Sequence, residues 1–178
     1  MFSELAKKRR SIKRYAAKPV EPEKMEAVLE AALRSPSGRA ARPWEFVVVT
    51  DRALLEKLST AKPMGAAFLK DAPAAVVVCA DASSSPLWIE DCSIAAVTMQ
   101  YAAQSLGLGS RWAQMRGNQY SDARTSTEYI GGLLGLPGNL TVHCIIAIGY
   151  PAEDMSPYRK EELRFDKVSY NRFGQRKP

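Results

Sequence analysis

Few residues in this 178-residue chain could carry acid, base or nucleophilic chemistry, because it contains one histidine and three cysteines. His143 lies in the apolar stretch 142–146, which is typical of a buried strand, and we interpret it as a structural residue. A Ser-His-Asp or Cys-His arrangement would depend on this one side chain, and a zinc site of the usual spacing cannot be assembled. The P-loop and GxGxxG motifs are also absent. If the chain is an enzyme, a bound organic cofactor would therefore carry the reaction.

A basic motif near the N-terminus, residues 8–15 (Lys-Arg-Arg-Ser-Ile-Lys-Arg-Tyr), is suited to binding an anion. Guanidinium groups bind phosphate in a bidentate manner, lysine adds a point charge, and a serine hydroxyl donates a further hydrogen bond. In an extended stretch Ser11 and Lys13 face one side, whereas Ile12 faces the other and can be buried. A basic run is also typical of a solvated surface, so for this motif alone both interpretations stay open.

A second polar segment, residues 35–46, joins a predicted helix to a predicted strand and contains Ser37 and Gly38. Its backbone groups and the Ser37 hydroxyl could contact a flat polar ligand, while Trp44 anchors the strand behind them. An ordinary helix-to-strand connection is the alternative interpretation of this loop.

The excess positive charge is concentrated at the two ends of the chain. The net charge is +6, yet residues 1–14 hold six basic and one acidic side chain, and residues 159–178 hold seven and three. The stretch between them is therefore mildly acidic. This distribution indicates a nucleic-acid arm, a solvated surface, or two ends that converge on one anion.

Hydrophobic periodicity predicts the elements that must position these motifs. We expect helices over residues 3–10, 22–33, 87–106 and 125–134, another helix capped by Asp51, and strands over residues 44–50, 74–80, 110–115 and 141–148. The order of these elements indicates an α/β or α+β sheet with helical cover. The alanine-rich stripe of helix 87–106 suits a central or subunit-interface helix.

The composition, 46% hydrophobic and 25% charged, is typical of one globular domain, which we expect to span residues 1–178. We expect the three cysteines to be buried, reduced thiols. The apolar run 72–82 is shorter than the ~20 residues that cross a bilayer, and the N-terminus is polar, so we expect a cytoplasmic protein without a membrane partner. Residues after Gly149 contain few apolar side chains and would pack against something else, such as another subunit.

Four motifs in this order resemble the nitroreductase family, whose members use flavin mononucleotide (FMN). Residues 9–13 are similar to Arg-Arg-Ser-Ile-Arg/Lys, and residues 36–44 are similar to Pro-Ser-(Ala/Gly)-x-Asn-x-Gln-Pro-Trp. Residues 102–112 (Ala-Ala-Gln-Ser-Leu-Gly-Leu-Gly-Ser-Arg-Trp) are similar to a family helix that ends in Leu-Gly-Leu-Gly-Ser-x-Trp. Residues 145–153 are similar to the last core strand of the family.

The resemblance implies an α+β, nitroreductase-like fold with a central mixed, mainly antiparallel sheet flanked by helices. It also implies a domain-swapped homodimer with two FMN sites at the interface, in which a C-terminal extension of about residues 159–178 packs on the partner subunit. The FMN contacts that it implies are Arg9, Arg10, Ser11 and Lys13 at the phosphate and ribityl chain, Pro36, Ser37 and Gly38 of the other subunit along the isoalloxazine, Trp112, Ala113, Gln114 and Met115 beside the ring, and Arg164 reaching the phosphate.

This chain departs from the family pattern in the second motif. Ala40 and Arg42 stand where the family has asparagine and glutamine, so a side-chain amide is lost and a cation is gained. If Arg42 reaches the pyrimidine end of the flavin, its charge would favour the reduced anion and raise the flavin potential.

The implied activity is hydride transfer from NAD(P)H to the flavin, followed by transfer to an electron-poor acceptor such as a nitroaromatic or a quinone, with no metal. The alternatives are a dehalogenating or flavin-modifying relative and an FMN-binding protein without turnover. A nucleic-acid binder with residues 7–14 as its arm is a further alternative. No run of aromatic residues accompanies that arm, so we do not expect a nucleic-acid partner.

Overall fold

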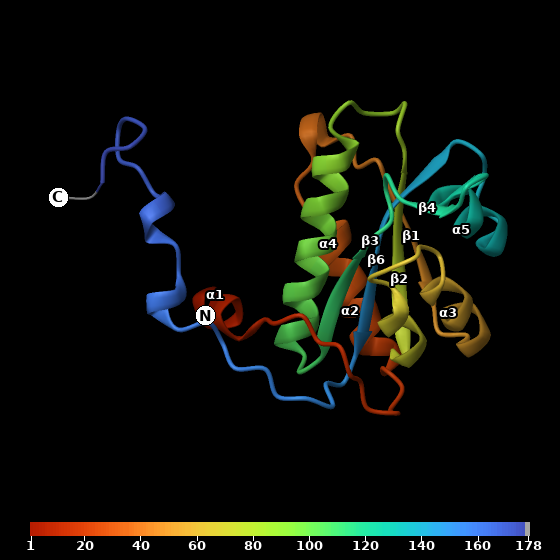
Figure 1. Ribbon diagram of the computed structural model, residues 1–178, viewed down its shortest axis with the longest axis horizontal. Helices are drawn as coiled ribbons and strands as arrows, with labels where there is room; N and C mark the ends of the chain where they lie inside the picture. The colour runs from red at the N-terminus through yellow and green to blue at the C-terminus, as the bar shows by residue number, and fades with distance from the viewer. Residues whose placement is uncertain (177–178) are drawn as a thin grey trace.

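Four antiparallel strands form the central sheet of the computed structural model, which describes residues 1–176 (Figure 1). They are β1 (Trp44–Val49), β2 (Ala74–Asp81), β3 (Gly109–Gln114) and β6 (Leu140–Gly149), in the order β1-β2-β6-β3. The two central strands are continuous apolar runs, because a strand covered on both faces is apolar throughout. A parallel bridge between Ser11 and Ser110 adds the parallel part of a mainly antiparallel sheet, as expected.

Helices cover both faces of this sheet (Figure 1). The helices α2 (Pro22–Leu33) and α4 (Trp88–Ser105) lie on one face, and α3 (Arg52–Ser59) and α5 (Ser126–Leu134) lie on the other. Successive side chains of β2 point into different layers, so that Val76 packs with α2 and α4, whereas Val77 packs with α3 and α5. The expected α+β architecture is confirmed.

Helix ends follow the signals in the sequence. The Asp51 carboxylate accepts a hydrogen bond from the Leu54 N–H at 2.8 Å and so caps α3. Thr125 and Glu128 form a reciprocal capping box at the start of α5, and Gly135, with φ of 68°, ends that helix. These local hydrogen bonds confirm the predicted positions of α3 and α5.

The expectations differ from the structure in the shortest elements. The helix expected over residues 3–10 is α1 (Phe2–Lys8), which ends because Arg9 adopts an extended backbone. Several short elements have no counterpart among the predicted ones: the hairpin of β4 (Gln119–Ser121) and β5 (Arg124–Thr125), and the 3-10 turns η1 (Gly38–Ala40), η2 (Ala67–Asp71), η3 (Lys160–Glu162) and η4 (Phe165–Lys167). Elements of two to five residues are too short to show a hydrophobic period, so sequence patterning does not reveal them.

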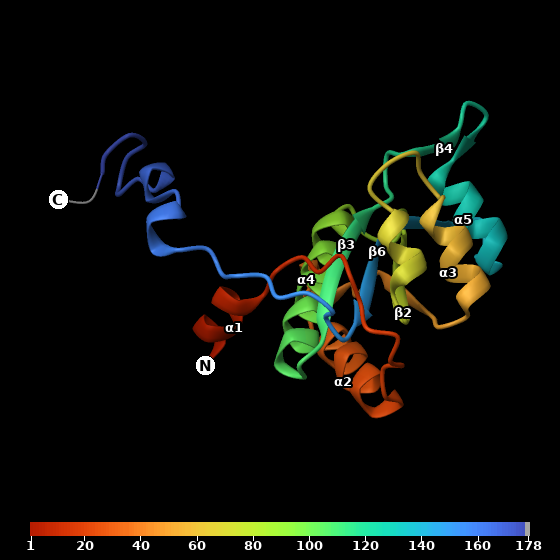
Figure 2. The same ribbon diagram turned by 60° about the horizontal axis from the view of Figure 1, so that its bottom comes forward.

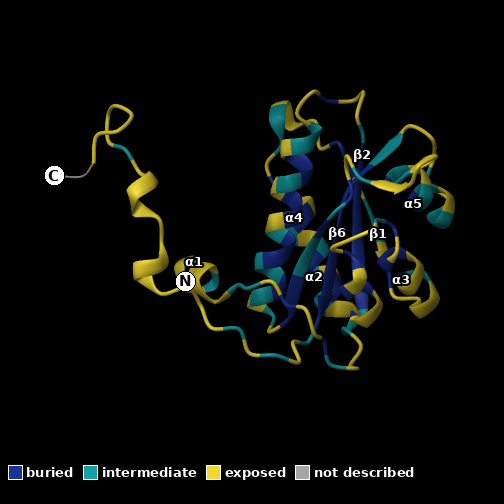
Figure 3. Ribbon diagram, in the orientation of Figure 1, coloured by how far each residue is buried: buried dark blue, intermediate teal, exposed yellow. Residues whose placement is uncertain are grey.

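After Gly149 the chain leaves the sheet as an arm, residues 150–176, that runs past α1 (Figures 1 and 2). Figure 3 shows that the far part of this arm is exposed. Its large apolar side chains are exposed as well, and Phe165 is 62% exposed. The arm therefore makes no core of its own, as expected. Of the expected extension over residues 159–178, the last two lie outside the described residues.

All three cysteines are free and buried, as predicted. Burial raises the pKa of the Cys79 thiol to about 11 and that of the Cys92 thiol to about 12. Within residues 1–176 no helix is both long enough and apolar enough to cross a membrane.

Candidate functional site

The N-terminal basic motif lies along the outer edge of β3. Ser11 forms the parallel bridge with Ser110, and the Ile12 N–H donates to the Ser110 carbonyl at 3.1 Å. Ile12 is 7% exposed, whereas Ser11 and Lys13 are exposed, which confirms the expected alternation. A Cβ on Gly109 would lie 2.6 Å from Ile12 Cγ1, so only glycine permits this close approach. The polar side chains of the motif therefore lie at the edge of the sheet.

Next to this bridge, the edge of β3 presents free backbone groups. Since the Ser110 carbonyl points outward to Ile12, the two-residue period of a strand turns the N–H and C=O groups of Trp112 and Gln114 outward as well. Within residues 1–176, β6 is the only strand that pairs with β3. Asn118 donates to the Gln114 carbonyl at 3.4 Å, which leaves the two N–H groups and the Trp112 carbonyl for a ligand with a flat, polar edge.

Ala113 on this strand and Met115 just after it present no groups at the open edge. Their side chains are 1% and 0% exposed and pack in the core layer that contains α3 and α5. Their backbones face β6, as the hydrogen bond from the Met115 N–H to the His143 carbonyl at 3.1 Å shows. Of the residues expected beside a flavin ring, Trp112 and Gln114 are thus the two that present groups at the open edge.

The first residues of the arm contact the basic motif. Arg10 donates to the Ser156 carbonyl, and its guanidinium lies 4.1 Å from the centre of the Tyr158 ring. Glu153 accepts a hydrogen bond from the Lys13 N–H, which lowers the pKa of that carboxyl. Close to these contacts, a cavity of about 140 Å³ lies between the motif and the end of α4. Within one chain the arm therefore orients Arg10, while the half-buried Arg9 ends α1.

Two further cations, Lys62 and Arg111, lie close to this edge, and neither was predicted from the sequence as a site residue. The Arg111 guanidinium stacks on the Phe68 ring at 4.2 Å. Burial, and secondarily the charge of Arg111, lower the pKa of Lys62. Burial raises the pKa of Tyr15, and the nearby charge of Arg111 partly offsets this rise. Since the Tyr15 hydroxyl donates to the Ile12 carbonyl at 3.0 Å, Arg111 lies beside the N-terminal motif.

Neither Lys62 nor Arg111 forms an ion pair in the part of the chain that the structure describes. Like charges brought together without a carboxylate favour an anionic ligand. Arg111 stands within the motif of residues 102–112, and its position on a predicted strand next to Trp112 could have identified it. The approach of Lys62 could not be predicted, since it depends on how two distant segments pack.

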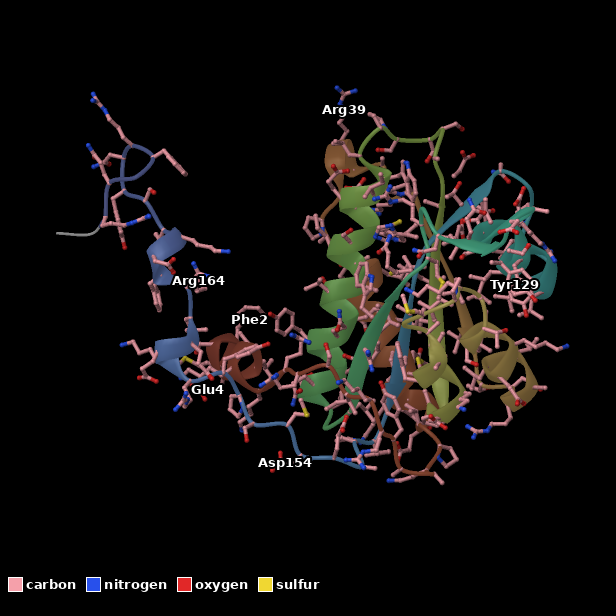
Figure 4. The ribbon with its side chains drawn as sticks, viewed as in Figure 1. Phe2, Glu4, Arg39, Tyr129, Asp154 and Arg164 are labelled. Carbon is pink, nitrogen blue, oxygen red and sulfur yellow. The ribbon has the colours of Figure 1, made fainter. Side chains whose placement is uncertain are left out.

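The second motif forms a strained loop at the other end of α4. The Gly38 N–H donates to Asp91 Oδ1 at 2.8 Å, and the Arg42 N–H donates to Ser37 Oγ at 3.0 Å. Arg39, Ala40 and Arg42 have φ of 54°, 55° and 48°, values that non-glycine residues rarely adopt. A Cβ on Gly38 would lie 2.4 Å from Leu87 Cδ1, so the loop lies closely against the start of the helix. Figure 4 shows Arg39 at this end of the molecule.

Within one chain the structure does not bring the two motifs together. The loop is bonded to the first turn of α4, whereas Ser11 pairs with Ser110 just beyond its last turn. A helix of 18 residues is about 27 Å long. Arg164 lies on the arm, where it pairs with Asp166 at 2.6 Å, away from both motifs (Figure 4).

His143 lies on β6 and packs against Trp112 of β3. It is 2% exposed, lies between the Trp88 and Trp112 rings, with centroids 5.9 and 5.4 Å away, and its Nε2 shares a hydrogen bond with Ser93 Oγ at 2.9 Å. Burial, with a smaller contribution from the Arg116 charge, lowers the pKa of His143 to about 4. The imidazole is therefore neutral near pH 7, as expected for a structural histidine.

One face of α4 is apolar and uncovered in the single chain. Ile94 and Val97 are 41% and 42% exposed, and Phe2 of α1 packs against Tyr101 with ring centroids 4.8 Å apart. These four residues, together with Ser93 and Thr98, line a cavity of about 440 Å³, which we call the α4 groove. An exposed apolar patch of this kind is typical of a protein interface.

The fold and this combination of an open sheet edge, basic residues and a glycine-containing loop define the class of protein. The model of the Nitroreductase family matches residues 6–62 and 58–150. The chain therefore belongs to the nitroreductase family.

Individual relatives agree with this assignment. The chain is 39% identical over 154 residues to a protein of Methanothermobacter thermautotrophicus provisionally named NADH dehydrogenase/NAD(P)H nitroreductase, with 85% of this chain and 78% of that protein covered. It is 25% identical over 201 residues to an iodotyrosine deiodinase of Thermotoga neapolitana, with 97% and 99% covered. The structure of an FMN-dependent nitroreductase from Clostridium difficile superposes with a TM-score of 0.93 at 44% identity, covering 95% of this chain and 98% of that one.

Proposed function

We propose that this protein is an FMN-dependent oxidoreductase that uses NAD(P)H to reduce an electron-poor acceptor such as a nitroaromatic or a quinone. The observation that carries the proposal is the open edge of β3 directly beside the basic motif. Such an edge offers hydrogen bonds to the polar rim of a flat ring system, and the motif offers charge to a phosphate. FMN has both of these groups, so the residues present fit this cofactor.

The chain contributes binding and orientation to this reaction. Arg9, Arg10, Ser11 and Lys13 would hold the phosphate and ribityl chain, with Lys62 and Arg111 as additional positive charges nearby. The backbone of Trp112 and Gln114 would bond the rim of the ring. When bound, FMN supplies the two-electron chemistry that the side chains lack.

The proposed active form is a domain-swapped homodimer with two FMN sites at its interface. In a two-fold dimer in which the α4 helices pack antiparallel, the start of one helix approaches the end of the other. The loop with Pro36, Ser37 and Gly38 would then approach the basic motif of the partner subunit, which it does not reach within its own chain. The uncovered α4 groove and the exposed arm with Arg164 support this arrangement, because both need a partner surface.

Reductive removal of a halide from a halogenated phenol is the second candidate reaction. The observation that favours it is the similarity to the deiodinase, which extends over nearly the whole chain. Both candidates use the same flavin site and differ in the acceptor. A direct comparison of acceptors therefore distinguishes them.

The test begins with protein that has been reconstituted with FMN and freed of excess flavin. We expect a yellow protein with a flavin absorption band that bleaches when NADH or NADPH is added without oxygen. Addition of a nitroaromatic, a quinone or an iodotyrosine should restore the band, and the fastest reoxidation identifies the acceptor class. A protein that binds no FMN, or whose bound flavin neither nucleotide reduces, would contradict the proposal.

A further inference from the structure

We propose that the loop of residues 36–42 carries an anion-binding subsite centred on Arg39, which takes a phosphate or carboxylate group of a substrate that approaches the flavin. This inference rests on the proposed function, because it concerns the loop that we assign to the flavin of the partner subunit. Arg39 is exposed and points away from the body of the protein at the start of α4 (Figure 4).

The two arginines of this loop form no ion pair with a carboxylate in the part of the chain that the structure describes. Residues 35–43 contain two arginines, Arg39 and Arg42, and no acidic residue. Neither arginine forms an ion pair within the described residues 1–176, whereas Arg34 pairs with Glu30 at 2.6 Å. Two guanidinium groups that are close together in sequence and form no ion pair attract an anion.

The backbone of the loop also indicates a use for these side chains. Arg39 and Arg42 both have positive φ, a conformation that glycine or asparagine would adopt with less strain. Strained residues of this kind persist where the surrounding structure holds them, and they cluster at ligand-binding segments. Here the hydrogen bond from the Gly38 N–H to the carboxylate of Asp91, which is 2% exposed, holds the loop. An arginine in a position that glycine or asparagine would occupy with less strain is explained if its guanidinium binds a ligand.

The cavity beside Arg39 contains a further donor. It has a volume of about 330 Å³ and is lined by residues of the loop and by Ser84, Ser85 and Leu87. Ser85 Oγ accepts a hydrogen bond from the Leu87 N–H at 3.1 Å, so its hydroxyl proton is free to donate to a ligand. A guanidinium and a hydroxyl together match the oxygens of a phosphate or carboxylate.

Two substrates could bring such a group to the flavin. NADPH carries a 2′-phosphate that NADH lacks, and an aromatic acceptor can carry a carboxylate. The same subsite would favour either substrate over the counterpart that lacks this particular group, so the two sources are separated by experiment.

The experiment compares the FMN-loaded wild type with Arg39→Gln, Arg39→Lys and the control Arg52→Gln. Arg52 is an exposed arginine that forms no ion pair within residues 1–176 and lies at the start of α3. One arm measures kcat/KM for 4-nitrobenzoate and for the neutral 4-nitrobenzyl alcohol. The second arm measures KM for NADPH and NADH. A third measures calorimetric binding of 4-nitrobenzoate and of NADPH to the oxidised protein, which requires no turnover.

In at least one of the two substrate pairs, we expect Arg39→Gln to lower the preference for 4-nitrobenzoate or for NADPH about tenfold, through KM and the calorimetric affinity, because one charge-assisted contact is lost. Arg39→Lys should retain part of the preference, and Arg52→Gln should match the wild type. If Arg39→Gln leaves the preference and the affinity unchanged in both pairs, or if Arg52→Gln lowers them equally, the subsite is wrong. A flavin that neither nucleotide reduces contradicts the proposed function instead, and the calorimetric arm then still decides the subsite.

Discussion

The edge of β3 and the loop of residues 36–42 present polar groups to the proposed flavin in different ways. The edge is built within one chain, from regular strand geometry and the hydrogen bond between Ile12 and Ser110. The loop is irregular, has three non-glycine residues at positive φ, and lies at the opposite end of α4. We infer that a single subunit already contains the first half of the site, whereas the second half becomes part of the site only in the dimer.

Substitutions in these two regions should therefore distinguish effects on the folded subunit from effects on dimer assembly. A change in the α4 groove should leave each subunit folded and remove the partner's contribution. A change at the edge of β3 should affect the half of the site that a single chain already contains.

The largest effect is expected from Val97→Glu. Val97 is 42% exposed in the single chain, so a charge there is tolerated by the fold but costly in a closed apolar interface. Sedimentation should show a monomer, and FMN affinity should fall by roughly a thousandfold or more, because the partner's loop and arm are lost. Leu33→Glu, at an apolar site on α2 that is 56% exposed, is the control and should remain dimeric. A Val97→Glu dimer with normal FMN affinity would show that the partner's loop does not enter through this face.

The second prediction concerns His143, which packs against Trp112 of β3. The pKa of His143 is about 4 in the folded protein, compared with 6.5 for a free histidine. As the pH falls, the unfolded chain binds a proton at His143 before the folded protein does. The contribution of neutral His143 to the free energy of unfolding is therefore complete above pH 6.5 and is lost as the pH falls toward 4. The loss is of the order of 3 kcal/mol.

Denaturant unfolding at several pH values measures this loss. His143→Gln has no titrating imidazole, so its free energy of unfolding should decline less between pH 6.5 and 4 than that of the wild type. Equal declines in the two proteins would mean that His143 titrates normally in the folded state.

The contrast between edge and loop also explains what could be predicted from the sequence. The strands β2 and β6 and the helices α2 and α4 are long and apolar enough that their pattern identifies them. The alternation of Ser11, Ile12 and Lys13 followed from strand geometry alone. By contrast, the pairing of Ser11 with Ser110 joins segments 99 positions apart, and the approach of Lys62 to Arg111 depends on that packing. Nothing in the sequence indicated the positive φ values of the loop, because arginine and alanine rarely adopt that conformation.

The third prediction tests the basic motif at the edge. Arg10→Glu replaces a cation beside the proposed phosphate with an anion and should weaken FMN binding by roughly 30-fold to 100-fold. Circular dichroism should show an unchanged fold, since Arg10 is only partly buried. The matched control Arg52→Glu should retain the flavin. Retention of FMN by Arg10→Glu at wild-type affinity would remove Arg10 from the phosphate site and leave it as an anchor for Ser156 and Tyr158 of the arm.

The smallest effect is expected in the loop, at the other end of the comparison. If Arg42 of the partner subunit approaches the pyrimidine end of the flavin, its charge stabilises the reduced anion more than the neutral oxidised ring. Arg42→Gln should therefore lower the midpoint potential, by about 20–30 mV, which for two electrons corresponds to about 1 kcal/mol. Arg34→Gln is the control, because its guanidinium already pairs with Glu30 and lies outside the loop. An unchanged potential in Arg42→Gln would mean that the loop lines the ring through its backbone and Ser37, with the arginine directed elsewhere.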